Sequence, residues 1–132
     1  MRLLIVEDSA LIRKVTRLAF PSREHELHEA ENGLEAVALV DSAERPFDAI
    51  LLDLQMPDMD GVAFIRALRQ RPLHRETPIV IATSEPETSA LVREARRLGV
   101  AGVAKKPWKP LELAAMVQQA CAQRTRPTIP PA

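Results

Sequence analysis

Short, nearly continuous runs of apolar residues recur along the chain. They lie at residues 3–6, 49–52, 79–82 and 100–104. Runs of this length are typical of strands that are buried on both faces, as in a parallel sheet covered by helices. A further segment, His25 to Ala30, alternates polar and less polar residues around Leu27, as expected of an edge strand with a wetter face. The pattern predicts about five strands.

The segments between these runs carry apolar residues at helical spacing. Three sets show it: Leu11, Val15 and Leu18; Leu34, Val37 and Val40; Leu91, Ala95 and Leu98. Strands and helices therefore alternate. Repeated crossovers from a strand through a helix to a parallel strand build a doubly wound α/β sheet, with helices on both faces.

Polar and conformationally special residues mark the expected helix ends. Three residues precede helical stretches and are expected as N-caps, because their side chains accept free backbone N–H groups: Ser9, Asn32 and Ser84. Pro86 and Pro110 suit a first helical turn, and Gly99 is expected to end a helix after Leu98.

The composition indicates one globular domain. The chain has 132 residues, of which 46% are hydrophobic, so it can bury a substantial core. Lys and Arg (18) balance Asp and Glu (18), so no net charge draws the chain to nucleic acid or to an anionic membrane. The single cysteine, Cys121, excludes an internal disulfide and is expected to be a small core residue. No apolar run suits a signal peptide or a membrane span, and we expect a cytoplasmic protein.

The last residues differ from the rest of the chain. From Arg124 onward, three prolines occur in nine residues and the apolar period is lost. We therefore expect a domain at residues 1–123, followed by a proline-rich tail or linker stub at 124–132.

Polar residues follow four of the predicted strands. In chain order they are Glu7 and Asp8, Asp53, Thr83 and Ser84, and Lys106. The carboxyl ends of parallel strands meet at one edge of a sheet, where open α/β sheets bind their ligands. These side chains are therefore expected to lie together.

Three carboxylates at one edge suit a divalent cation. Mg²⁺ prefers oxygen ligands and retains several waters, and Glu7, Asp8 and Asp53 supply such oxygens. A nearby ammonium such as that of Lys106 would offset part of their mutual repulsion. Taken singly, the acidic pair is often a solvated loop, Asp53 a turn residue, Thr83 a helix cap and Lys106 a surface lysine. Their convergence favours a functional site.

Four separated motifs resemble the receiver domain of bacterial two-component response regulators, across residues 2–122. They are Val6 to Ser9, Leu52 to Gly61, Thr83 with Ser84, and Lys106 with Pro107. The chain is similar in particular to the chemotaxis-type single-domain receiver. The resemblance implies a flavodoxin-like sheet of five parallel strands in the order 2-1-3-4-5.

The resemblance also implies roles for the residues at the sheet edge. Asp53 would accept a phosphoryl group from a sensor histidine kinase or a phosphotransfer protein, and the domain would be a switch rather than an enzyme, although it promotes its own phosphorylation and dephosphorylation. Mg²⁺ would be held by Glu7, Asp8, Asp53 and the backbone carbonyl of Gln55. The phosphoryl oxygens would be contacted by Thr83, Lys106 and the backbone N–H groups of Leu54 and Ser84. The Lys106–Pro107 bond is expected to be cis, because the chain must turn sharply while aiming Lys106 at the site.

Two positions depart from the family pattern. Val103 stands three residues before Lys106, where the family usually has the Tyr or Phe that rotates on switching. Trp108 stands where Phe is common, and we expect it to pack in or against the core. The output face implied by the resemblance comprises the fourth helix, the last strand and the fifth helix, which would bind an output protein or a second receiver. Four basic residues are expected to favour an acidic partner there: Arg93, Arg96, Arg97 and Lys105.

Three alternatives are weighed against this interpretation. The chain can be the receiver part of a longer regulator with a DNA-binding or enzymatic output domain. A Mg²⁺-dependent aspartyl-phosphate hydrolase of the haloacid dehalogenase type needs a second Asp two residues after the nucleophile, where Gln55 stands. A degenerate receiver used only for binding is disfavoured by the intact set of acidic, hydroxyl and lysine residues. The three histidines, His25, His28 and His74, lie away from this set and are expected in solvent without a role.

Overall fold

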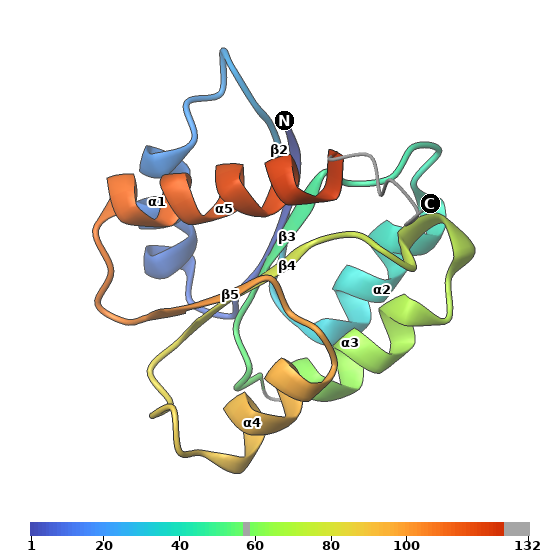
Figure 1. Ribbon diagram of the computed structural model, residues 1–132. Helices are drawn as coiled ribbons and strands as arrows, with labels where there is room; N and C mark the ends of the chain where they lie inside the picture. Colours follow the sequence, from blue (N-terminus) through green and yellow to red (C-terminus); the bar gives the residue numbers. More distant parts are fainter. Residues whose placement is uncertain (57–58, 126–132) are drawn as a thin grey trace, which may run out of the picture.

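Five strands and five helices alternate along the part of the chain that the structure describes, residues 1–56 and 59–125 of a computed structural model (Figure 1). The strands are β1 (Arg2–Val6), β2 (Glu26–Ala30), β3 (Ala49–Leu52), β4 (Ile79–Thr83) and β5 (Gly102–Lys105). The helices are α1 (Ala10–Ala19), α2 (Gly33–Ser42), α3 (Gly61–Arg69), α4 (Ala90–Arg97) and α5 (Pro110–Thr125), with a short 3-10 helix, η1, at Pro72–His74.

The strands form one parallel sheet in the order β2-β1-β3-β4-β5. This confirms the doubly wound fold that the apolar pattern predicted and the strand order that the family resemblance implied. β2 lies at one edge of the sheet, and Ala30 is its only buried residue. The pairing of β1 with β3 places Val6 beside Leu52, so the residues that follow these two strands emerge side by side.

Helices cover both faces of the sheet. α1 and α5 lie on one face, and α2, α3 and α4 lie on the other (Figure 1). Alternate residues of each strand therefore enter two different cores. Within β1, Leu4 and Val6 pack on the α2–α4 side, whereas Leu3 and Ile5 pack on the α1–α5 side. The runs of apolar residues follow from this double burial.

The helix caps were predicted in part. The side chains of Ser9 and Asn32 accept backbone N–H groups at the starts of α1 and α2, and Gly99 has a φ of 85° after α4. The prediction for the start of α4 is wrong, because Ser89 rather than Ser84 is its N-cap. Pro86 therefore precedes the helix instead of lying in its first turn.

The sequence analysis did not single out α3, although this helix supports the site. Its N-cap is Asp60, whose carboxylate accepts the N–H of Ala63 at 2.8 Å. The N–H of Gly61 donates to the carbonyl of Leu54 at 2.9 Å. A Cβ at Gly61 would lie 2.7 Å from Leu54 Cα, so only glycine allows the start of α3 to approach the end of β3 this closely.

The expectation that all three histidines lie in solvent is wrong. His74 is fully buried, and its Nε2 accepts the backbone N–H of Phe47 at 3.2 Å. The His25 ring meets the Phe20 ring edge-on at a centroid distance of 5.6 Å, and the ring of His28 meets that of Phe47 at 5.5 Å. The three histidine rings therefore take part in packing, away from the carboxylates at the carboxyl ends of the strands.

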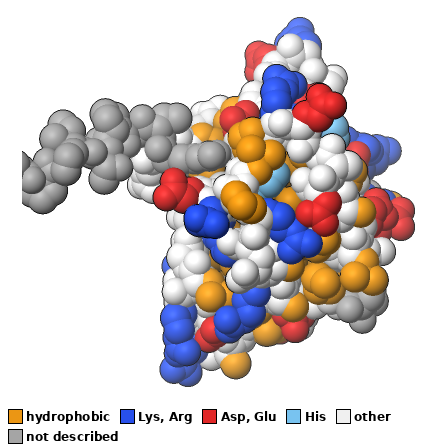
Figure 2. All heavy atoms as spheres, turned by 90° about the vertical axis from the view of Figure 1, so that its right-hand side faces the viewer, with side chains coloured by type: hydrophobic (Ala, Val, Ile, Leu, Met, Phe, Trp, Pro, Cys, Tyr) orange, Lys and Arg blue, Asp and Glu red, His pale blue; other side chains and the backbone are white. Residues whose placement is uncertain are grey.

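The face of the molecule drawn in Figure 2 carries charges of both signs, as the equal numbers of acidic and basic residues suggested. The apolar spacing of α1, however, does not mark its buried face. Leu11 and Leu18 are 68% and 71% exposed, whereas the buried residue of the helix is Thr16.

Among the described residues, no helix combines the length and apolar character needed to cross a membrane.

Candidate functional site

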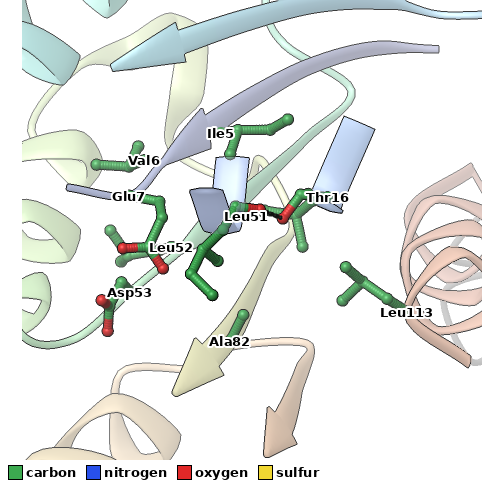
Figure 3. Close-up of a pocket in the computed structure, with 10 residues that line it drawn as sticks. Ile5, Val6, Glu7, Thr16, Leu51, Leu52, Asp53, Ala82 and Leu113 are labelled. Atoms are coloured by element: carbon green, nitrogen blue, oxygen red, sulfur yellow. Dashed lines mark hydrogen bonds between the residues drawn. The ribbon is translucent and has the colours of Figure 1, made fainter. Parts of the chain in front are cut away.

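Three carboxylates gather where β1 and β3 end. Oxygen atoms of Glu7, Asp8 and Asp53 lie within 4.8 Å of one another. Glu7 and Asp53 are only 4% and 8% exposed, while Asp8 is exposed to solvent. Figure 3 shows the Glu7 and Asp53 side chains side by side. Both residues line a small cavity of about 10 Å³. The structure thus brings together the acidic residues that the sequence singled out.

Lys106 reaches the same cluster from β5. Its Nζ lies 2.5 Å from Glu7 Oε1 and 3.4 Å from Asp53 Oδ2. The backbone N–H of Lys106 donates to the carbonyl of Thr83 at 2.8 Å, which holds the end of β5 against β4. The Lys106–Pro107 peptide bond is cis, as predicted.

Thr83 and Ser84 lie at the same edge, one strand away. Leu52 pairs with Ile81, so the chain beyond β3 runs alongside Thr83. Thr83 is fully buried, and its hydroxyl oxygen accepts the N–H of Glu85 at 3.1 Å. Ser84 is exposed, whereas Leu54 is fully buried. Leu54, Thr83 and Ser84 thus follow or end the strands on this edge of the sheet.

A hydrogen bond that the sequence analysis missed joins the loops after β3 and β4. Gln55 Nε2 donates to Glu85 Oε1 at 2.5 Å. The backbone N–H of Gln55 also donates to Asp53 Oδ1 at 3.1 Å, so this residue orients the buried carboxylate. Gln55 and Glu85 each stand two residues beyond a strand-end site residue, Asp53 and Thr83. That shared offset on adjacent strands is the one signal that could have indicated the contact.

Without a bound cation, the site disfavours the negatively charged form of Glu7. Burial, together with the neighbouring Asp8, raises the pKa of the Glu7 carboxyl to about 7, although the Lys106 ammonium opposes the shift. Burial alone would lower the pKa of Lys106, but its contacts with Glu7 and Asp53 raise that pKa above its usual value. One ammonium therefore compensates only part of the acidic charge.

The donor set fits Mg²⁺. The cluster offers oxygen atoms only, from three carboxylates with both buried and exposed members. Mg²⁺ favours such hard ligands and keeps some of its waters, which an exposed residue such as Asp8 permits. A bound cation would also neutralise the charge that burial makes costly at Glu7.

Comparison with known proteins agrees with this arrangement. The family model described as the response regulator receiver domain matches residues 3–118. The chain belongs to this family. The transcriptional regulatory protein SrrA of Staphylococcus aureus is 36% identical over 126 residues, which are 96% of this chain and 49% of SrrA. The chain thus spans about half the length of the curated relatives it matches.

Solved structures of receiver domains share the fold closely. The chemotaxis response regulator CheY4 of Vibrio cholerae has a TM-score of 0.80 and 32% identity, covering 90% of this chain and 97% of that one. The receiver domain of the sensor histidine kinase PA1611 from Pseudomonas aeruginosa has a TM-score of 0.81 and 25% identity, covering 92% and 97%. That structure holds a magnesium ion in its active-site cleft. The acidic cluster of the present chain is thus like a receiver Mg²⁺ site.

The raised pKa of Glu7 predicts that Mg²⁺ binding depends on pH. Below a pH of about 7 the carboxyl is protonated and must lose its proton to bind a cation, so affinity should rise by up to about tenfold per pH unit and level off above that value. In the metal-free protein, the same shift means that stability falls as the pH rises from the ordinary value of 4.5 through about 7.

Isothermal titration calorimetry with MgCl₂ and urea unfolding across this pH range measure both effects. The control is Glu7→Gln, which has no proton to lose at this position and should flatten both profiles. An equally steep pH dependence in Glu7→Gln would assign the effect to another group.

Proposed function

We propose that this receiver is a phosphorylation-dependent signalling switch that accepts a phosphoryl group on Asp53. The observation that carries the proposal is the position of the Asp53 carboxylate: it lies 3.4 Å from the Lys106 ammonium, inside the three-carboxylate cluster and nearly buried. A nucleophile held beside a cation site and an ammonium is what phosphoryl transfer requires, because catalysis there rests on positioning and charge neutralisation.

The transfer forms one bond and breaks one. A carboxylate oxygen of Asp53 bonds to phosphorus as the P–N bond of a phosphohistidine breaks, and the leaving imidazole takes up a proton from solvent. Mg²⁺ supplies charge neutralisation on the transferred oxygens. The groups that would hold it are Glu7, Asp8, Asp53 and the backbone carbonyl of Gln55. The phosphoryl oxygens would meet the Thr83 hydroxyl, the Lys106 ammonium and the N–H groups of Leu54 and Ser84.

The same site argues against a hydrolase of the dehalogenase type. Such an enzyme needs a carboxyl two residues after the nucleophile, and this place holds the Gln55 side chain, which is engaged by Glu85. The chain would therefore keep its phosphoryl group long enough to change partner binding. It would act as a switch that assists its own phosphorylation and dephosphorylation.

The receiver matches nearly the whole of the CheY4 chain and about half of SrrA. We propose residues 1–123 as the receiver and 124–132 as a tail or linker. α5 continues through Thr125, and residues 126–132 lie outside the described part of the chain.

Labelling with acetyl phosphate tests the acceptor. The wild-type protein should gain one phosphoryl group in intact-mass spectra only when Mg²⁺ is present, and Asp53→Asn should gain none. Asp60→Asn is the matched control: it removes a carboxylate from the same loop but keeps an N-cap side chain on α3. Labelling of Asp53→Asn at the wild-type rate would show that the acceptor is another residue.

The donor's approach is suggested by an apolar groove next to the site. A hollow of about 270 Å³ is lined by Ile12, Val15, Lys106, Pro107 and Trp108. Lys106 thus belongs to both the groove and the carboxylate cluster. The most exposed large hydrophobic side chains of the described residues lie on two helices, α1 and α5: Leu11, Leu18 and Leu111.

This apolar surface supports a protein phosphodonor as the occupant. Leu11, Val15 and Leu18 share one helical face, and exposed apolar patches of this kind mark protein contacts. A partner seated here would present a phosphohistidine beside Lys106 and Asp53. We therefore place the sensor histidine kinase or phosphotransfer protein on the α1 face.

Comparing labelling by a small phosphodonor with labelling by a protein phosphodonor separates docking on α1 from the phosphoryl transfer itself. The double substitution Leu11→Ser and Leu18→Ser should leave labelling by acetyl phosphate unchanged. It should slow labelling by a phosphorylated histidine phosphotransfer protein, chosen by screening for one that labels the wild type, by about tenfold or more. Equal slowing with both donors would mean that the substitutions disturb the site itself.

The output face is less basic than the sequence suggested. Of the four basic residues expected there, Arg96 pairs with Glu87 and Arg97 with Glu94. Arg93 and Lys105 are exposed on α4 and β5. We propose that an output protein or second receiver binds this α4–β5–α5 face, with local charge pairs rather than a uniform positive field setting the contact.

Val103 stands where the family usually has a rotating aromatic side chain, so the signal would reach that face by another route. It lies in β5, partly buried against the α2–α4 core, and its β-branched side chain has few rotamers. Backbone NMR of the free and beryllofluoride-bound forms should therefore show the largest shifts at Asp53, at residues 83–88 and at Lys106, with smaller ones at Val103. If Val103 and its strand neighbours shift most while residues 83–88 stay unchanged, the signal travels along β5 instead.

A further inference from the structure

Arg13 connects three separate parts of the receiver through one guanidinium group. Its Nη1 donates to the backbone carbonyl of Glu7 at 2.7 Å. Its Nε lies 3.3 Å from Glu29 Oε1 at the end of β2, and its Nη2 lies 3.6 Å from Glu31 Oε1 in the following loop. The Arg13 side chain is only 12% exposed and that of Glu29 27%, whereas that of Glu31 is 66% exposed.

The carbonyl that Arg13 holds belongs to the peptide that joins Glu7 to Asp8. Fixing the plane of this peptide sets the direction in which the chain leaves Glu7, and therefore where the Asp8 side chain points. The peptide units on either side are anchored as well, because the N–H of Glu7 donates to the Ala30 carbonyl and the N–H of Ser9 donates to Glu7 Oε2. Asp8 itself is exposed and needs such support from its backbone.

We propose that Arg13 is a positioning residue for the cation site: by holding the Glu7 carbonyl, it orients the Glu7–Asp8 pair toward Asp53. The inference rests on the proposed function, since it concerns the same Mg²⁺ site. It goes further in assigning part of the affinity to a residue that does not touch the cation. Groups that orient metal ligands in this way typically account for a 10- to 100-fold effect on affinity.

The geometry requires arginine rather than a cation in general. One planar group donates to a carbonyl and at the same time forms ion pairs with two carboxylates. A lysine ammonium is a point charge on a flexible stem and cannot reproduce that fork. Arg17, one turn further along α1, provides a natural comparison, because it pairs with the same Glu29 at 2.6 Å but is 47% exposed.

Mg²⁺ titration of the full chain by calorimetry tests the proposal, with Arg13→Met, Arg13→Lys and the control Arg17→Met. Arg13→Met should weaken Mg²⁺ binding about tenfold, Arg13→Lys should weaken it less, and Arg17→Met should leave it unchanged. Acetyl phosphate labelling gives a second readout: the Mg²⁺ concentration for half-maximal rate should rise in the Arg13 variants, while the rate at saturating Mg²⁺ stays near that of the wild type.

The outcomes separate this inference from the proposed function. If the wild type binds Mg²⁺ and both Arg13 variants bind it equally well, Arg13 has no positioning role and the proposed function stands. A loss of stability in urea unfolding without a change in Mg²⁺ affinity likewise overturns the inference, because it shows a structural role only. Absence of Mg²⁺ binding in the wild type itself would overturn both.

Discussion

The structure depends on two acidic side chains that are nearly buried beside a single ammonium. Glu7 and Asp53 sit at the ends of adjacent strands, and Lys106, 99 residues after Glu7, contacts both. Burial makes the negative charges costly, as the raised pKa of Glu7 shows, and one lysine offsets only part of that cost. The folded receiver therefore carries an excess of buried negative charge that a bound cation would offset. The buried carboxylates therefore account both for the unfavourable charge of the metal-free site and for its capacity to bind a cation.

The parallel sheet makes this arrangement possible. Its order puts β1 next to β3, so Glu7 and Asp53 are neighbours, while β4 stands between β3 and β5. Lys106 must consequently reach across the end of β4 to meet the carboxylates. Its long, flexible stem spans that distance, and the small side chains of Ala82 and Thr83 at the end of β4 leave room for it. Glycine at position 61 then lets α3 close against Leu54 and fixes the other wall of the site.

Features that are local in sequence could be predicted, and those that depend on distant contacts could not. Apolar runs mark the strands because double burial excludes polar side chains over four or five residues. The cap of α4 was misplaced because Ser84 and Ser89 are equally good caps, and only the path of the loop decides between them. His74 lies in a polar stretch, yet it is fully buried and accepts the backbone N–H of Phe47, 27 residues away. Arg13 carried no recognisable signal, since its role follows from a backbone carbonyl that any residue at position 7 would present.

The apolar face of α1 shows where the usual inference from amphipathicity fails. Leucines at helical spacing normally identify the buried side of a helix, but here they point outward while Thr16 points inward. Thr16 can be buried because its hydroxyl donates to the carbonyl of Ile12 at 2.7 Å, so this hydroxyl has a hydrogen-bond partner inside the protein. The exposed leucines gain nothing for the stability of the isolated domain. The proposed protein phosphodonor would cover this face, and Val15, which lies on it, also lines the groove that reaches Lys106 beside Asp53.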